Sequence, residues 1–307
     1  MPTAETKYYT AGSVVVAIIC TVAAAAFLSL IYGPADHYSP LIYLNMLLAY
    51  GVAAATGFVG KKMIRVKKIT SLGAASLIGG IGGFATLFLS WASYVWTLAD
   101  FDFSVYFDHI LHPRYFWHLM NFLAENPMWT IGKGSGTLPA IAYYAIWLIE
   151  AGIIIGVPIM ACRNFVRDNV LCDGCGTWIA ATGDAAVFDV SGEEGDARER
   201  EQRIGTGDIA LLLDLPRLDP SVTGVPRMEA IGLACPYCED KDSYVTVNFV
   251  TEKAAKKKRK PEIVRKKIVA NAPVPVELEK ALFEPATPPA PPISESTDTA
   301  EEARISL

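Results

Sequence analysis

Four long apolar runs lie in the first half of the chain, and polar residues dominate the second half. The runs are Ala11–Tyr32, Leu41–Gly60, Ser71–Trp96 and Leu138–Ala161. Each is long enough, as a helix, to cross about 30 Å of hydrocarbon. We therefore predict an α-helical polytopic membrane protein with four transmembrane helices across residues 11–161, after a short N-terminus at 1–10.

The first run has an alternative interpretation as a cleaved signal peptide, with the alanines at 23–26 beside a processing site. The run is long for a signal core, however, and only one lysine, Lys7, precedes it. We favour a retained helix that ends at a turn around Gly33 and Pro34.

The lysines and arginines predict the orientation. Five of them lie between the second and third runs, and Arg163 and Arg167 follow the fourth run, whereas 34–40 has none and the loop 97–137 has two. Because basic residues stay on the cytoplasmic side, both termini should be cytoplasmic, as in a bacterial inner-membrane protein.

Composition agrees with membrane insertion. Of 307 residues, 52% are hydrophobic and 19% are charged, and the mean hydropathy is +0.30. These values are unusual for a globular enzyme. The net charge of -5 combines basic clusters beside the apolar runs with acidic residues near the C-terminus.

Small residues at four-residue spacing predict a close contact between the third and fourth helices. Ala75, Gly79 and Gly83 form one stripe, and Gly152 and Gly156 repeat the spacing. Such stripes let two backbones approach closely.

Glu150 is the only acid within a predicted span. A carboxylate there is costly, so it is a candidate for a proton or cation relay. The alternative is a neutral acid that hydrogen-bonds Tyr50, Thr86 or Thr21.

The external loop 97–137 predicts an amphipathic helix that starts after Pro113 and stops before Pro127. An acid and three histidines make a possible external metal site, although packing is the simpler role for histidines here. They are Asp108, His109, His112 and His118.

Two C-x-x-C pairs carry the strongest chemical signal. Cys172 and Cys175 form one pair, and Cys235 and Cys238 form the other. Two such pairs make a tetrahedral four-sulfur site, and residues 172–240 resemble the zinc-ribbon class. The resemblance implies a structural zinc ion held between short strands.

The domain expected around this site spans 162–252. Its spacing departs from a zinc ribbon, because the pairs are far apart and require an insertion at 183–222. Ribbon strands are expected at 178–179, 228–233 and 244–250, where polar and apolar residues alternate in the last segment.

Three other chemistries compete with a structural zinc ion at these cysteines. A redox C-x-x-C pair needs thioredoxin-like surroundings, which this glycine-rich segment does not predict. Iron takes the same four-sulfur geometry and would indicate electron transfer. A catalytic zinc ion needs an open position, which four thiolates do not leave.

The C-terminal region divides into a basic segment at 253–271 and a disordered, proline-rich acidic tail at 272–307. The basic segment predicts attraction to anionic lipid, with nucleic acid a weaker alternative. Its densest part is Lys256, Lys257, Lys258, Arg259 and Lys260.

The combined prediction is an integral membrane scaffold or accessory subunit whose zinc domain docks a protein partner or the membrane surface. The alternative is a transporter or channel component that uses Glu150. A membrane-anchored electron-transfer protein comes third. No residue pattern typical of a catalytic site was found, so an enzyme is not favoured.

Overall fold

The computed structural model describes residues 9–39, 42–125, 139–172, 174–190, 194–222, 224–235, 237–238, 243–253 and 262–284. The chain divides into two compact units. The helical unit comprises residues 1–181 and 233–242, and the sheet unit comprises 182–232 and 243–307.

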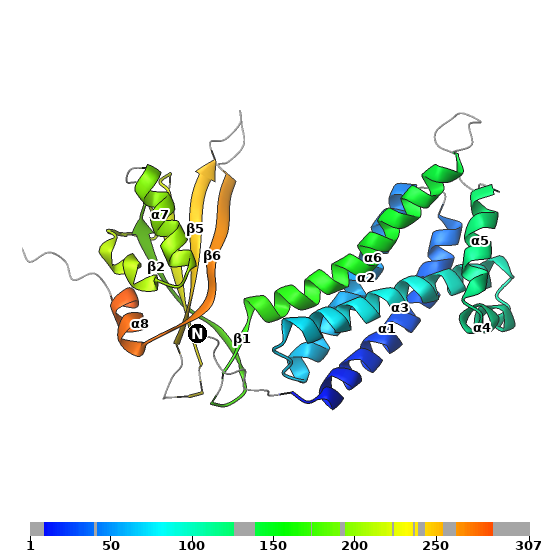
Figure 1. The fold of residues 1–307 in the computed structure, drawn as a ribbon, viewed down its shortest axis with the longest axis horizontal. Helices are drawn as coiled ribbons and strands as arrows, with labels where there is room; N and C mark the ends of the chain where they lie inside the picture. Colours follow the sequence, from blue (N-terminus) through cyan, green and yellow to red (C-terminus); the bar gives the residue numbers. More distant parts are fainter. Residues whose placement is uncertain are drawn as a thin grey trace, which may run out of the picture. The chain divides into compact units, whose positions relative to one another are not determined.

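Four helices of the helical unit are long and apolar enough to cross a membrane, counted among the described residues. They are α1 (Ala11–Tyr38), α2 (Ile42–Val66), α3 (Leu72–Leu98) and α6 (Ala140–Asp168), and they run alongside one another (Figure 1). Side-chain caps define two of the starts, because the hydroxyls of Thr10 and Ser71 accept hydrogen bonds from the first turns of α1 and α3. The prediction of four long apolar helices is confirmed.

The first helix is longer than predicted. The expected turn at Gly33 and Pro34 is wrong, since α1 continues through both residues. Proline is tolerated in apolar helices because neighbouring groups satisfy the backbone atoms that it frees. Gly33 is needed for packing, because a Cβ there would lie 2.6 Å from Ser93 Oγ on α3.

The contact between α3 and α6 depends on the glycines of α3. A Cβ on Gly79 would lie 2.6 Å from the carbonyl oxygen of Pro158, and a Cβ on Gly83 would lie 2.8 Å from that of Ile154. Ala75 of the same stripe is fully buried. Small residues therefore let the two backbones touch, as predicted for α3.

The predicted contribution of α6 to this contact is wrong. A Cβ on Gly152 or Gly156 would meet nothing within 4 Å, so both glycines lie away from α3. Spacing identifies a smooth stripe on a helix, but it does not show whether a neighbour covers that stripe.

Two shorter helices follow α3. They are α4 (Phe103–Leu111), which was not predicted, and α5 (Arg114–Glu125), which agrees with the predicted helix after Pro113. The apolar side of α5 packs inward: Leu123 and Ala124 are buried with Tyr143 of α6. Residues 126–138 lie outside the described structure.

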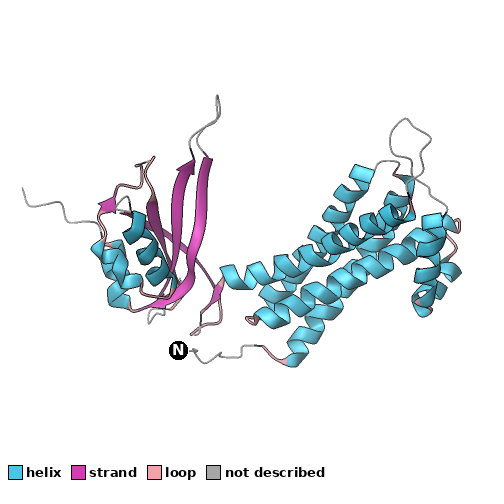
Figure 2. Ribbon diagram, turned by 45° about the horizontal axis from the view of Figure 1, so that its top comes forward, coloured by secondary structure: helices cyan, strands magenta, loops and turns pink. Residues whose placement is uncertain are grey.

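The β-structure forms one sheet with strand order β1-β2-β4-β5-β6, and β3 pairs with β2 (Figure 2). The strands are β1 (Val170–Leu171), β2 (Trp178–Asp189), β3 (Arg217–Leu218), β4 (Arg227–Ala234), β5 (Ser243–Lys253) and β6 (Glu262–Val274). All three predicted strand positions fall within β2, β4 and β5. The antiparallel β5–β6 pair places Val250 opposite Arg265.

Helices cover one face of this sheet and close the core of the sheet unit (Figure 2). They are α7 (Glu194–Gly205), the 3₁₀ helix η1 (Ile209–Asp214) and α8 (Val276–Phe283). Ile204, Leu212 and Leu282 from these helices are fully buried. They pack with strand residues that include Phe188, Met228, Val245 and Val247.

The expected boundaries in the second half of the chain need correction. The insertion at 183–222 contains the end of β2 together with α7, η1 and β3, so it is part of the sheet unit's core. Residues 262–283, which span the described end of the basic segment and the start of the predicted tail, form β6 and α8. Residues 254–261, with Lys256–Lys260, and 285–307 lie outside the described residues.

Candidate metal centre and helix-bundle cavity

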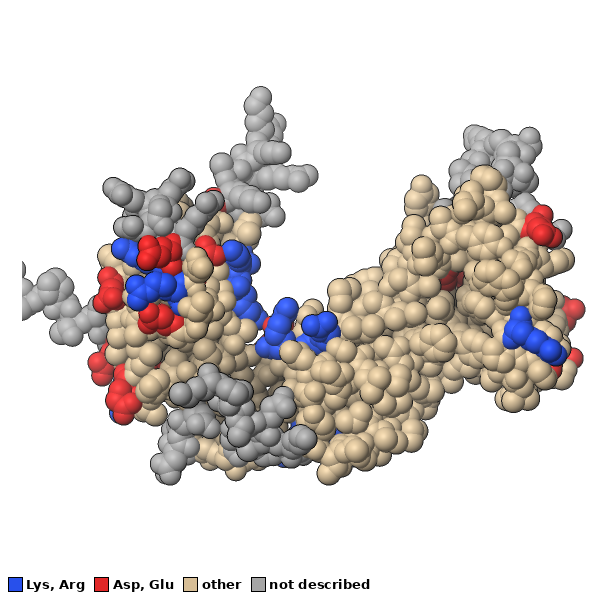
Figure 3. Space-filling view, in the orientation of Figure 1, with Lys and Arg blue, Asp and Glu red and all other residues tan. Residues whose placement is uncertain are grey.

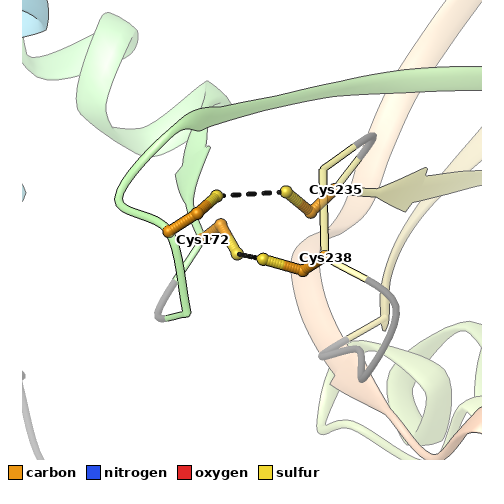
Figure 4. Close-up of side chains that lie close together, drawn as sticks. Cys172, Cys235 and Cys238 are labelled. Atoms are coloured by element: carbon orange, nitrogen blue, oxygen red, sulfur yellow. Dashed lines mark hydrogen bonds between the residues drawn. The ribbon is translucent and has the colours of Figure 1, made fainter.

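Four cysteines meet at one point of the helical unit. Cys172 and Cys175 lie in the turn between β1 and β2, and Cys235 and Cys238 follow β4. Their sulfur atoms all lie within 4.8 Å of one another. The side chains of Cys172, Cys235 and Cys238 converge in Figure 4.

The sulfur spacing fits one tetrahedral metal ion. Sγ atoms are 3.7 Å apart between Cys172 and Cys238, and 3.4 Å apart between Cys175 and Cys235. A zinc ion with about 2.3 Å bonds to four sulfurs requires sulfur–sulfur distances of about 3.8 Å. The donor set and geometry therefore fit a four-thiolate metal site.

The first cysteine turn is shaped by its backbone. The N–H of Cys172 donates to the carbonyl of Thr177 at 2.9 Å, and the N–H of Gly176 donates to the carbonyl of Cys172 at 2.9 Å. Gly176 has φ +64°, a left-handed conformation that strains most other residues. Gly174 provides room, since a Cβ there would lie 3.2 Å from Cys238 Sγ.

The thiol groups differ in acidity. Hydrogen bonding from Thr177 lowers the pKa of Cys175 to about 6. Hydrogen bonding with Cys175 and Cys172 raises the pKa of Cys238 to about 12, and burial raises the pKa of Cys172. The proton of Cys175 is thus lost readily, whereas deprotonation of Cys172 and Cys238 is favoured by a compensating cation such as a metal ion.

The cysteine turn is attached to the ends of two long helices. The indole Nε1–H of Trp178 donates to the carbonyl of Arg65 in α2 at 2.9 Å. The Trp178 ring also meets Phe165 of α6 edge-on, with centroids 5.1 Å apart. Only Asn169 separates α6 from β1. These contacts hold the site against the helix ends within one unit.

The predicted external metal site is not formed. Among the described residues, the four cysteines are the only group of three or more His, Cys, Asp or Glu that converges on a metal position. Asp108 pairs with His112 at 2.8 Å on the surface, whereas His109 is buried. Burial lowers the pKa of His109, which favours the neutral ring. Among the described residues, His118 forms no potential metal site with Asp108, His109 or His112.

Glu150 has a different partner from those expected. The Tyr32 hydroxyl donates to Glu150 Oε1 at 2.6 Å. Thr86 bonds Thr56 instead, at 2.9 Å between hydroxyls, and Thr21 donates to a backbone carbonyl of its own helix. Tyr50 is 55% exposed.

Glu150 lines a cavity between the apolar helices at the bundle end away from the cysteines, and sequence reasoning missed this cavity. Its empty volume is about 490 Å³, including space open to the surroundings. A second acid, Asp36 of α1, also lines it. The sequence predicts an end of the first span at Pro34, which leaves Asp36 outside it, whereas α1 continues to Tyr38 and brings Asp36 into the bundle.

Comparison of the chain with models of known families, with curated proteins and with solved structures finds no match.

Proposed function

We propose that this protein is an integral membrane scaffold or accessory subunit that carries a structural zinc ion at its four cysteines. The observation that supports the proposal best is the convergence of four sulfurs within 4.8 Å from two distant segments. Four thiolates fill a tetrahedral shell and leave no position for substrate, which favours a structural ion over a catalytic one.

The zinc ion would join two chain segments that are far apart in the sequence and flank β2 and β4, which are hydrogen-bonded neighbours in the sheet. The turn at Cys172 is attached to the ends of the long helices through Trp178, whereas Cys235 directly follows β4. A structural zinc contributes on the order of 10 kcal/mol to small sites of this kind. The ion would therefore stabilise the attachment of β1 and the start of β2 to the ends of α2 and α6.

Docking of a cytoplasmic protein partner is assigned to the sheet unit. On the face seen in Figure 3, charged groups are frequent on the sheet unit, whereas most of the helical unit is uncharged. On β6, however, Arg265 and Lys266 already form ion pairs with Glu229 and Glu201. The lipid attraction proposed for the basic segment therefore depends on Lys256–Lys260, outside the described residues.

Topology is part of the proposal. Four spans with both termini in the cytoplasm would place the thiolates in a reducing compartment, where they remain available to metal. Reporter fusions after Gly60 should report the cytoplasm, and fusions within 126–138 should report the opposite side. The reverse result would move the cysteines outside and remove the argument for zinc.

Crosslinking capture in intact cells tests the docking role. Cys238→Ser should remove the metal and lower capture of a specific partner about tenfold or more, while the protein stays in the membrane. Cys20→Ser, a cysteine of α1 outside the cluster, is the matched control and should capture normally. Equal capture by both variants would contradict a metal-dependent docking domain. Iron in place of zinc would indicate the electron-transfer alternative.

A further inference from the structure

The cavity beside Glu150 combines acids with an unusual number of aromatic rings. Five of its lining side chains are aromatic: Tyr32, Trp91, Tyr94, Tyr143 and Trp147. They come from α1, α3 and α6. The cavity therefore lies among the long helices of one unit, which also supply both acids.

The rings stand at steep angles to one another. Trp91 and Trp147 meet at 83° with centroids 5.4 Å apart, and Trp91 and Tyr94 meet at 60° with centroids 6.1 Å apart. Tyr143 and Trp147 are tilted by 47°. These are edge-to-face and tilted packing contacts, and the rings that make them also line the cavity.

The charge of the lining is one-sided. Asp36 and Glu150 both line the cavity, and no Lys or Arg is among its lining residues. Glu150 has a hydrogen bond from Tyr32, but Asp36 Oδ1 is buried without a hydrogen-bond partner. Acidic atoms are visible in a recess between the helices in Figure 3. A cation in this cavity would offset the cost of ionising two acids in an apolar setting.

The surroundings favour an organic cation over a metal ion. Calcium and magnesium require about six to eight oxygen ligands, and the described cavity brings together only two carboxyl groups. Aromatic faces, in contrast, attract ammonium groups within about 6 Å of the ring centre, and they also bury the attached carbon atoms. The combination of ring faces and carboxylates matches an alkylammonium ion.

We propose that this cavity binds a small organic ammonium cation. The carboxyl groups of Asp36 and Glu150 supply the opposite charge, Tyr32 orients Glu150, and Trp91 and Trp147 supply ring faces. This inference goes beyond the scaffold function and is independent of the metal centre. A cation site here is what a transporter or channel component using Glu150 would require.

Calorimetry on the full-length protein in detergent tests the site. The probes are choline and 3,3-dimethyl-1-butanol, which has the same shape with carbon in place of the charged nitrogen. Choline should bind at least tenfold more tightly, because only it carries charge. Equal binding of both probes, or no binding of choline, would overturn the proposal. Heat from sodium chloride alone that exceeds the choline signal would also overturn it.

Variants locate the binding. Glu150→Gln and Asp36→Asn keep side-chain shape and should each weaken choline binding about tenfold or more. Asp168→Asn, at the exposed far end of α6, is the matched control and should bind as wild type does. Unchanged binding in both cavity variants would place the site elsewhere and refute the assignment. If a variant does not fold, the difference in affinity between choline and 3,3-dimethyl-1-butanol for the wild-type protein still tests the proposed cation site.

Discussion

Gly79→Ala is expected to destabilise the helical unit although it adds only one methyl group. The new Cβ would lie 2.6 Å from the carbonyl oxygen of Pro158 and 2.8 Å from Ile159 Cα. Both are backbone atoms, so no side chain can rotate away. The helices α3 and α6 would have to separate locally.

The magnitude follows from the contacts. Overpacking of this kind costs about 1–3 kcal/mol. Gly156→Ala is the matched control on the opposing helix, because its Cβ would meet nothing within 4 Å. That change should be neutral or stabilising by up to about 1 kcal/mol, since alanine favours helix more than glycine does.

Unfolding of the two variants in detergent, followed by circular dichroism at 222 nm, measures the difference. The account predicts that Gly79→Ala is less stable than Gly156→Ala by about 1–3 kcal/mol, because the gain in helix propensity is common to both variants and only the overpacking cost differs. Equal stability would refute the close contact between α3 and α6. Gly83→Ala should behave like Gly79→Ala and gives an independent repeat.

Three further predictions concern other parts of the chain. Arg227→Met should destabilise the sheet unit by about 3–5 kcal/mol, because it leaves the charge of the partly buried Glu252 uncompensated. The control Arg265→Met removes an exposed partner and should cost about 1 kcal/mol or less, so equal costs for the two variants would contradict a stabilising buried ion pair. Limited proteolysis of Cys172→Ser should release the β-structure and leave a protected helical fragment, and a wild-type digestion pattern would argue against a structural metal. Burial lowers the pKa of His109, so as the pH falls the unfolded state binds a proton before the folded state does, and the free energy of unfolding should decrease below about pH 6.5. His109→Gln should show a smaller decrease, and a pH profile identical to wild type would exclude His109 as its source.

Much of the architecture could be predicted from the sequence because the responsible forces are local. Runs of apolar residues identified the four long helices, and C-x-x-C spacing identified all four cysteines that converge. Alternation along 244–250 identified β5. Each of these patterns expresses a constraint within a short stretch of chain.

The remaining features depend on which surfaces meet. Gly33 and Pro34 look like a helix end in the sequence, but α1 continues through them and Gly33 packs closely against Ser93 of α3. Likewise, Gly152 and Gly156 match a packing stripe but have no neighbour within 4 Å. The aromatic cavity was missed because its rings come from three helices that are distant in sequence.

Metal analysis combined with X-ray absorption spectroscopy tests the central claim most directly. Protein purified under reducing conditions should contain about one zinc ion per chain, bound by four sulfurs at about 2.3 Å. Cys235→Ser should lose the ion, whereas Cys20→Ser should retain it. Wild-type protein without metal, or a zinc ion bound by nitrogen or oxygen ligands, would contradict a four-cysteine centre.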